Sequence, residues 1–152
     1  VAGRFNFGML FSHLRTPEQY RAYVAAYRQA GGRNRIAINR PVFVGPTDAA
    51  AFEAAEPALR TLWRRFRAEG KIPSDTPEPR SPADLCGHPI NFIVGGPETV
   101  AGRLRKLYEQ VPFDVANVEV RWAGLSHDQV RQSLQRLMDD VVPRLGLNSH
   151  AR

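Results

Sequence analysis

The chain has 152 residues, 43% of them hydrophobic, which suits one ordinary domain with its own core. No apolar run approaches the roughly 20 residues that a membrane-spanning helix requires, so we expect no membrane partner. The net charge of +6 permits nucleic-acid binding. The arginines are spread along the predicted helices without aromatic platforms, which disfavours that function.

Cysteine usage limits the chemistry further. Cys86 is the only cysteine, which excludes an intramolecular disulfide and a multi-cysteine metal site. Cys86 and His88 lie two residues apart, but such a pair alone is weak support for a metal, and we expect no metal site. The sequence shows no basic segment followed by an apolar one, as a secretory leader would have, and we expect a cytoplasmic protein.

The first predicted elements are a strand and a helix. Residues 5–11 form a short apolar, aromatic run that is typical of a buried strand. Thr16 is a good helix cap, and Pro17 suits the first helical position after it. Tyr20, Tyr23, Val24 and Tyr27 would share one packed face of this helix, which should end at the glycines at 31–32.

A second strand and helix follow. Residues 36–44 alternate as a strand, although Pro41 removes one donor from the ladder. A helix over 49–69 contains Pro57, which predicts a kink or a division into two helices. Residues 70–89 hold five prolines and predict an extended surface loop within one domain rather than a linker between two.

The last third predicts a helix, a strand and a helix. Residues 90–94 are a short extended piece that leads into a helix over 97–110. Residues 115–122 predict a strand, and Ser126 caps a last helix that reaches Val141. Strands that alternate with helices favour parallel βαβ units, so we predict an α/β fold in a single domain over 1–152.

Polar residues interrupt the predicted strands. They are Asn39, Arg40, Asn117, Glu119 and Arg121. Central strands are usually rich in valine and isoleucine, and polar side chains there cost free energy unless they are paired. Two interpretations stay open: a polar cavity that holds a ligand, or an internal ion-pair network such as Glu119 with Arg40 or Arg121.

The segment GGPETV at 95–100 opens the 97–110 helix. Backbone N–H groups at a helix N-terminus can bind a phosphate. The segment is neither a Walker A loop nor GxGxxG, and Glu98 already complements the helix dipole. We therefore favour a plain helix start over a phosphate site.

Several stretches, in order, resemble the bacterial-luciferase-like, flavin-dependent monooxygenases. Residues 1–14 are similar to that family's sixth strand and following loop, and RIAINRPVFV at 35–44 to its seventh strand. TDAAA at 47–51 is similar to a helix entry of the family, and NFIVGGPETV at 91–100 to its phenylalanine–glycine–proline–glutamate helix start. The resemblance implies the C-terminal portion of a (β/α)8 TIM-like barrel, with about three parallel strands and their covering helices.

The resemblance also implies a cofactor and site residues. Family members bind reduced flavin mononucleotide (FMN), or the deazaflavin F420, and the flavin monooxygenases use O2 to oxygenate a small organic substrate. The end of the sixth strand borders the flavin ring, which corresponds here to Met9, Leu10, Phe11 and Ser12. Residues at the carboxyl ends of barrel strands face the active site.

Two further residues fall at such strand ends. His13 is a candidate general acid or base there, although a histidine on a surface loop would look the same. Trp122 is a candidate pocket wall, although large aromatic side chains usually just pack in the core.

A complete barrel needs roughly 250 residues, so we expect this chain to be a fragment whose N-terminal barrel half is its natural partner. The phosphate-binding loops of the family lie in that half, and the fragment alone should be inactive. Its uncovered sheet edges predict self-association. The alternative function is a non-catalytic binding or assembly module derived from the barrel.

Overall fold

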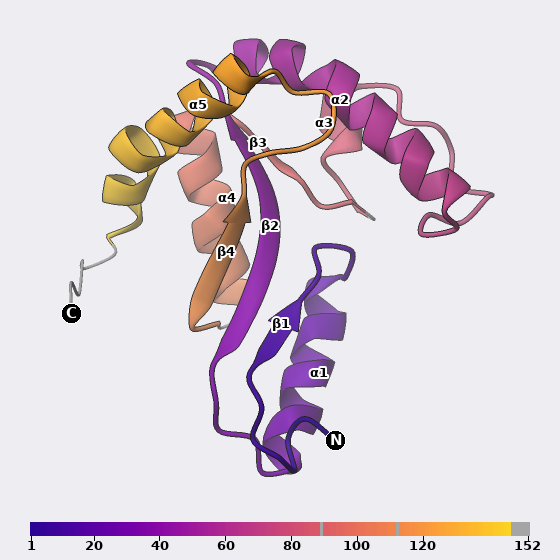
Figure 1. The fold of residues 1–152 in the computed structure, drawn as a ribbon, viewed down its shortest axis with the longest axis vertical. Coiled ribbons are helices and arrows are strands. Elements are labelled where there is room, and N and C mark those ends of the chain that lie inside the picture. The colour runs from indigo at the N-terminus through magenta and orange to yellow at the C-terminus, as the bar shows by residue number, and fades with distance from the viewer. Residues whose placement is uncertain (89, 112, 147–152) are drawn as a thin grey trace.

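Four strands of one parallel sheet form the centre of the molecule. A computed structural model describes residues 1–88, 90–111 and 113–146. The strands in this part of the chain are β1 (Met9–Phe11), β2 (Ile36–Val44), β3 (Ile93–Gly95) and β4 (Val115–Glu119) (Figure 1). The predicted α/β class and parallel arrangement are confirmed, and β3 adds a short strand to the three that were predicted.

The described residues form five α-helices. They are α1 (Pro17–Gln29), α2 (Asp48–Ala68), α3 (Pro82–Leu85), α4 (Pro97–Gln110) and α5 (His127–Arg136). Thr16 and Ser126 each form a capping box with the residue three positions on, which satisfies two free N–H groups at the helix start. After α5 the chain continues as a π-helical turn, η1 (Leu137–Val141), and a 3-10 turn, η2 (Val142–Leu145).

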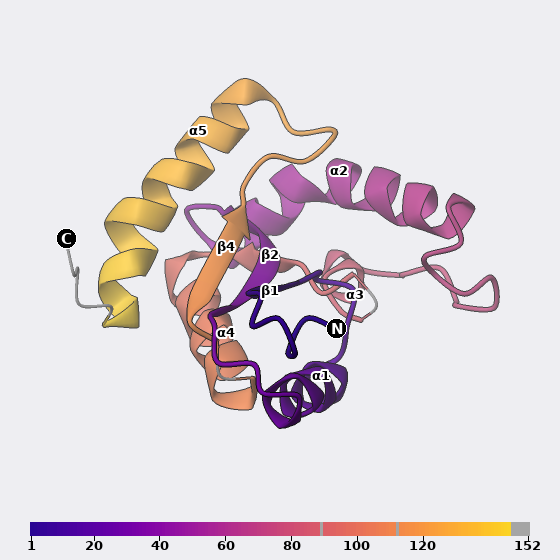
Figure 2. The same cartoon turned by 60° about the horizontal axis from the view of Figure 1, so that its bottom comes forward.

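Strand β2 lies at the centre of the sheet and pairs with each of the other strands. Its first half pairs with β1, with Leu10 opposite Ala37, and its last three residues pair with β3. On the β4 side Asn39 lies opposite Asn117. All three pairings are parallel, so the carboxyl ends of the strands meet at one end of the sheet, where α2 and α5 lie across it (Figures 1 and 2).

Both outer strands are shorter than predicted. The chain before β1 turns instead of extending, because Asn6 adopts a left-handed conformation with φ of 50°. The Asn6 carboxamide accepts hydrogen bonds from the N–H groups of Arg33 and Asn34 at 2.7 and 2.9 Å, which fixes the turn. Strand β4 ends at Glu119 rather than at Trp122.

The structure refines two predictions about the middle of the chain. Helix α2 is one continuous helix of 21 residues with Pro57 inside it, so it is not divided at that proline. The proline-rich segment after α2 is mostly loop, as predicted, but it contains the short helix α3.

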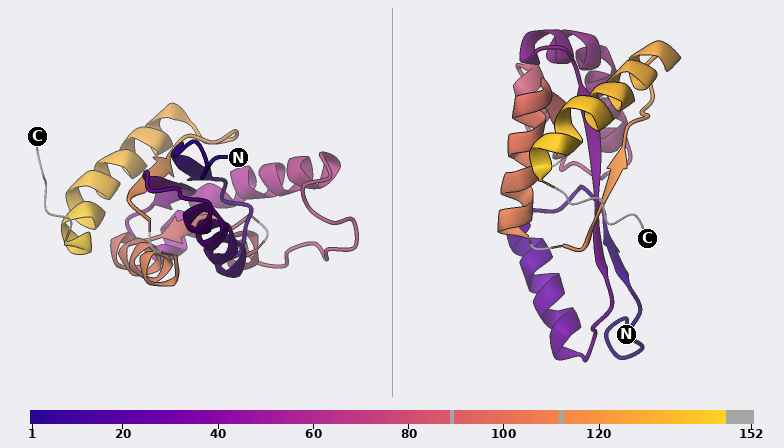
Figure 3. Two further views of the ribbon diagram at one scale, coloured as in Figure 1. Left: turned by 90° about the horizontal axis from the view of Figure 1, so that it is seen from below. Right: turned by 90° about the vertical axis from the view of Figure 1, so that its left-hand side faces the viewer.

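The two faces of the sheet differ in what covers them. Helices α1 and α4 lie on one face, as the right-hand view of Figure 3 shows. Ile36 and Ile38 of β2 point toward this face and pack with Tyr20 and Tyr27 of α1. Further along β2, Val42 and Val44 pack with residues of α4. This face therefore carries two of the hydrophobic clusters.

The opposite face is covered only near the carboxyl ends of the strands. There Phe43 packs with residues of α2 and with Phe92 and Trp122. Toward the other end of this face Leu10 is 63% exposed and Val115 is 38% exposed. No helix among the described residues is long and apolar enough to cross a membrane.

Candidate functional site

A row of polar side chains crosses the open face of the sheet. Asn39 and Asn117 lie opposite each other in the register of β2 and β4. The Asn117 amide donates to Asn39 Oδ1 at 3.0 Å, and the Asn39 amide donates to Glu119 Oε2 at 3.3 Å. Continuing the β1 register by one residue brings Ser12 beside Asn39. We call Ser12, Asn39, Asn117 and Glu119 the polar row.

An apolar layer lies directly below the polar row. Leu10 is paired with Ala37, and Ala37 is paired with Val115 on its other side. Side chains of a parallel strand alternate between faces, so this layer and the row above it belong to the same face. In a (β/α) barrel such inward layers fill the interior, and the layers nearest the carboxyl ends form the floor of the active site.

Arg40 does not belong to the polar row. Its side chain lies on the α1 face, is only 4% exposed, and donates from Nη1 to the Tyr20 hydroxyl at 3.0 Å. Among the described residues no ion pair joins Glu119 to Arg40 or to Arg121, so the interpretation as an ion-pair network is wrong in that form. Adjacent strand residues point to opposite faces, and this alternation separates Arg40 from Asn39.

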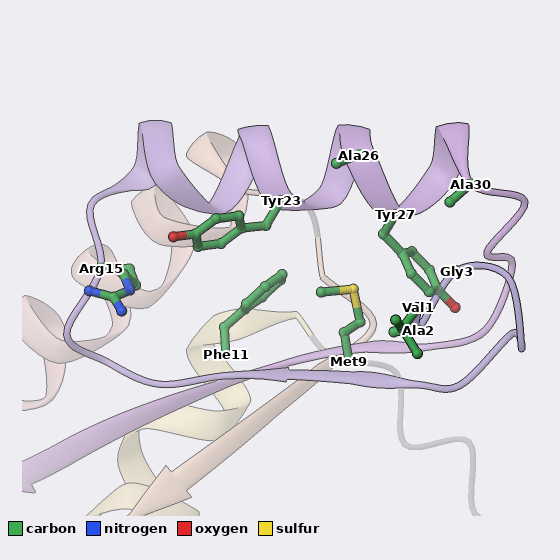
Figure 4. A pocket seen from close by; sticks show the side chains of 10 residues that line it. All are labelled: Val1, Ala2, Gly3, Met9, Phe11, Arg15, Tyr23, Ala26, Tyr27 and Ala30. Atoms are coloured by element: carbon green, nitrogen blue, oxygen red, sulfur yellow. The ribbon is translucent and has the colours of Figure 1, made fainter.

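The four residues predicted to border a flavin ring divide between the two faces. Met9 and Phe11 point toward α1, where Phe11 stacks on Tyr23 with a ring-centre distance of 6.0 Å (Figure 4). Together with the N-terminal residues they line a surface pocket of about 500 Å³ between β1 and α1 (Figure 4). Leu10 is exposed on the open face, and Ser12 is exposed just beyond the strand. Only these two are available to a ligand on that face.

The loop after β1 is fixed by hydrogen bonds from two other parts of the chain. The Tyr20 hydroxyl of α1 donates to the Ser12 carbonyl at 2.5 Å, while Arg40 of β2 donates to the same hydroxyl. The Asn91 amide donates to the His13 carbonyl at 2.7 Å. A loop held from two sides presents its residues in one conformation, as a preorganised site requires.

His13 lies inside this loop against aromatic rings. Its ring centre is 5.3 Å from that of Phe92 and 5.9 Å from that of Phe66. Within the described part of the chain both ring nitrogens are buried without a hydrogen-bond partner. Desolvation is the largest cause that lowers the pKa of His13 to about 4, and the positive charges of Arg40 and Lys71 contribute to the same shift. His13 is therefore a neutral, packed histidine, which does not match a surface loop histidine.

The N-terminus of α4 is occupied by a carboxylate of the chain itself. Asp48 Oδ1 accepts from the Gly96 N–H at 2.6 Å, and Asp48 Oδ2 accepts from the Thr99 hydroxyl at 2.8 Å. A carboxylate at a helix N-terminus uses the same donors and the same positive end that a phosphate would use. These contacts support the plain helix start that the sequence favours.

Trp122 and Cys86, which the sequence also singled out, are both buried. Trp122 is 5% exposed and packs edge-on against Phe92 with ring centres 4.7 Å apart, so it belongs to the core. Burial raises the pKa of the Cys86 thiol to about 12, which keeps it protonated. Within the described residues no group of three or more histidine, cysteine or acidic side chains could hold a metal.

The polar row has a definite hydrogen-bonding character. Because Asn117 donates to Asn39 and Asn39 donates to Glu119, acceptor oxygens of Asn117 and Glu119 remain directed away from these bonds. The row can therefore receive N–H or O–H donors from a bound group. Sequence reasoning grouped Asn39, Asn117 and Glu119 as strand residues that could line a polar cavity. It did not add Ser12 to them, since only the strand register brings Ser12 beside Asn39.

Known structures share this fold. The monooxygenase RslO1 from Streptomyces bottropensis superposes with a TM-score of 0.73 at 13% identity, over 93% of this chain and 43% of that one. The oxygenating constituent of 3,6-diketocamphane monooxygenase from Pseudomonas putida, a type II Baeyer–Villiger monooxygenase in complex with FMN, has a TM-score of 0.57 at 25% identity over 95% and 44% of the two chains. EDTA monooxygenase from Chelativorans sp. BNC1 has a TM-score of 0.60 at 19% identity, over 95% and 43%.

The chain thus spans less than half the length of these structural relatives. A comparison with curated proteins found no match. The profile of the luciferase-like monooxygenases matches residues 1–114, which is three quarters of the sequence and includes β1, β2, β3 and α4. The chain belongs to the luciferase-like monooxygenase family.

Proposed function

We propose that this chain supplies the C-terminal strands of a flavin-dependent monooxygenase, whose remaining strands come from an N-terminal barrel half. The observation that carries the proposal is the polar row above an apolar layer, on a sheet face that a complete barrel would enclose. Membership of the family supports this reaction class. The cofactor proposed is FMN, which the 3,6-diketocamphane enzyme binds; the deazaflavin F420 is the alternative.

The residues of the open face suit part of such a cofactor. Leu10 offers an apolar wall and Ser12 a hydroxyl, and both are exposed beside the polar row. Bound reduced flavin would supply the electrons that activate O2, and the protein would position it and exclude water. Neither Met9 nor Phe11 would contact the ring from this face, because α1 covers them.

A site for the FMN phosphate is the part of the cofactor site that we do not assign to these residues. The α4 N-terminus is already bonded to Asp48. Phosphate contacts contribute much of the anchoring of a nucleotide through charge-assisted hydrogen bonds. We therefore propose that the N-terminal half holds the phosphate, and that this chain alone carries out no oxygenation of a small organic substrate.

A flavin-fluorescence titration tests the proposal on two proteins. The first is residues 1–152, and the second is the same chain extended upstream by roughly 150–200 residues of its reading frame. We expect saturable FMN binding and oxidation of reduced flavin only in the extended protein, with binding in the millimolar range or weaker for residues 1–152. A parallel titration with F420 distinguishes the two cofactors.

Two outcomes would contradict the proposal. Tight FMN binding by residues 1–152 would mean that the phosphate site lies within them, and an Asp48→Ala variant would then show whether the α4 N-terminus is that site. An extended protein that binds neither cofactor would favour the non-catalytic assembly module. That alternative is supported by the large uncovered face of the sheet.

A further inference from the structure

A second pocket, of about 550 Å³, lies beside the C-terminal half of α2. It is formed by Trp63 of α2, the proline-rich loop that follows this helix, and α3 (Figure 1). All of its lining residues fall between positions 63 and 90 and outside the strands. We call it the proline-loop pocket. It is separate from the polar row and from the sheet face and edges assigned to the N-terminal barrel half, and its size suits a small organic molecule.

Trp63 brings a free hydrogen-bond donor to this pocket. The residue is 4% exposed, it packs in the same hydrophobic cluster as Phe92, and the guanidinium carbon of Arg67 lies 5.1 Å from its ring centre. Within the described chain no group accepts a hydrogen bond from the indole N–H, although a buried tryptophan usually has such a partner. The buried side-chain polar atoms without a partner there are the ring nitrogens of His13. The indole N–H is therefore not sealed in the core, and the pocket is where Trp63 reaches the surface.

Arg80 supplies a positive charge to the same pocket. It is exposed, and among the described residues its guanidinium forms no ion pair and no hydrogen bond. The carboxylate of Asp84 is engaged by the backbone instead, since its Oδ2 accepts from the N–H groups of Ser81 and Arg80 at 2.9 and 3.2 Å. A guanidinium offers five donors and matches the geometry of a carboxylate. The pocket thus combines a free cation with a free neutral donor.

The rim of the pocket is apolar and held in place. Pro77 and Pro79 lie on it. Arg60 donates from Nη1 to the Pro79 carbonyl at 3.4 Å, and Arg67 donates to the Ser74 carbonyl, so the loop is tied to α2 at two points. Proline also fixes the backbone angle φ, which leaves such a loop little freedom to lose when a ligand binds. The rim is therefore preorganised for the apolar part of a ligand.

We propose that the proline-loop pocket binds a small organic acid. The carboxylate of the acid accepts from the Arg80 guanidinium and from the Trp63 indole N–H, and its apolar part lies against Pro77 and Pro79. Both free groups are donors and one is cationic, which favours a carboxylate over an alcohol or an amine. Glu78, the other acidic residue in the lining, repels an anion and keeps the affinity modest. The flavin and the N-terminal barrel half take no part in this site.

Nuclear magnetic resonance of residues 1–152 tests the proposal, because the chain has two tryptophans and therefore two indole N–H signals. The indole N–H of Trp122 donates to the Glu119 carbonyl at 3.1 Å, so its signal is an internal control, and a Trp122→Phe variant assigns the two signals. Hexanoate should move the Trp63 signal in a saturable way, with a dissociation constant on the order of 1 mM, and leave the Trp122 signal in place. Hexanol and hexylamine have the same apolar chain without the carboxylate and should bind at least about fivefold more weakly.

Arginine variants locate the carboxylate without disturbing the core. Arg80→Gln should weaken hexanoate binding about fivefold, because it removes the charge that the carboxylate requires. Arg64→Gln is the matched control, since Arg64 is an exposed arginine of α2 outside the pocket lining, and it should bind hexanoate like the parent chain. A Trp63 signal that stays in place with hexanoate, or that moves equally with hexanol or hexylamine, would overturn the proposal. Equal hexanoate affinities of the Arg80→Gln and Arg64→Gln proteins would overturn it as well.

Discussion

Asn39 and Arg40 are neighbours in the chain with opposite surroundings. Asn39 takes part in the polar row of the open face, while Arg40 is buried under α1 against the Tyr20 ring, with its guanidinium carbon 5.2 Å from the ring centre. At the residue scale the outcome depends on strand alternation, because one step along β2 changes the face. These two polar residues therefore have different roles. Asn39 is available to a ligand, and Arg40 positions the loop after β1 through its hydrogen bond to the Tyr20 hydroxyl.

His13 gives the pH dependence expected at this scale. Its folded pKa of about 4 lies below its ordinary value of 6.5, so the unfolded chain binds more protons between those pH values. Stability should be complete above pH 6.5 and fall by about 1–2 kcal/mol as the pH is lowered toward 4, given the partial exposure of the ring. A His13→Phe variant should lose this fall, because an apolar ring suits the contacts with Phe66 and Phe92.

Urea midpoints measured by tryptophan fluorescence at pH 7 and near pH 4.5 provide the check. His88→Phe serves as the control, because His88 is exposed and should leave the pH dependence unchanged. Equal acid sensitivity in His13→Phe and the parent chain would contradict the assignment of His13 as a buried neutral group.

At the scale of elements, α5 closes the part of β2 that lies beyond β4. The Ser133 hydroxyl is 1% exposed and accepts a hydrogen bond from the Val44 N–H at 2.8 Å. A side chain thus takes the place of a strand partner, which keeps a buried backbone donor satisfied. The hydrophobic stripe of α5 predicts that this helix packs on the sheet, but this hydrogen bond depends on where β4 ends.

Ser133→Ala should therefore destabilise the fold by about 1–3 kcal/mol, because it leaves the Val44 N–H buried and unbonded. Chemical denaturation of the two proteins measures the difference. Gln132→Ala, an exposed change on the preceding residue of α5, should cost little stability. A Ser133→Ala protein as stable as the Gln132→Ala protein would show that water or another group satisfies Val44.

At the scale of the whole molecule, β2 is the one strand with partners on both sides in the described chain, and seven of its nine residues are buried. Its burial pattern is almost continuous, whereas β4 is mostly exposed. Stability within a domain follows such differences in burial, and segments with few buried contacts open first.

Hydrogen exchange in dilute protein should follow this order. Peptides that cover Ile36–Val44 should exchange last, and peptides that cover Val115–Glu119 should exchange well before them. Mass spectrometry of peptic fragments gives the rates. Equal protection of the two segments in a monomeric sample would mean that the sheet is not organised around β2.

Much of this molecule could be predicted from the sequence, for local reasons. The capping residues Thr16 and Ser126 mark helix starts because their hydroxyls satisfy neighbouring N–H groups, and both predictions are confirmed. The α4 boundaries at 97 and 110 agree for the same kind of reason. The family resemblance, carried by the order of short motifs, is likewise confirmed.

Only the tertiary structure decided how distant residues meet. The length of β4, the alignment of Asn39 with Asn117, and the bond from Gly96 to Asp48 all join positions far apart in the chain. Sequence patterns report propensities over a few residues, while register depends on which strands pair and where each one stops. The sequence by itself therefore determined the long helices, the parallel α/β class and the family, and the fold determined which side chains share the open face.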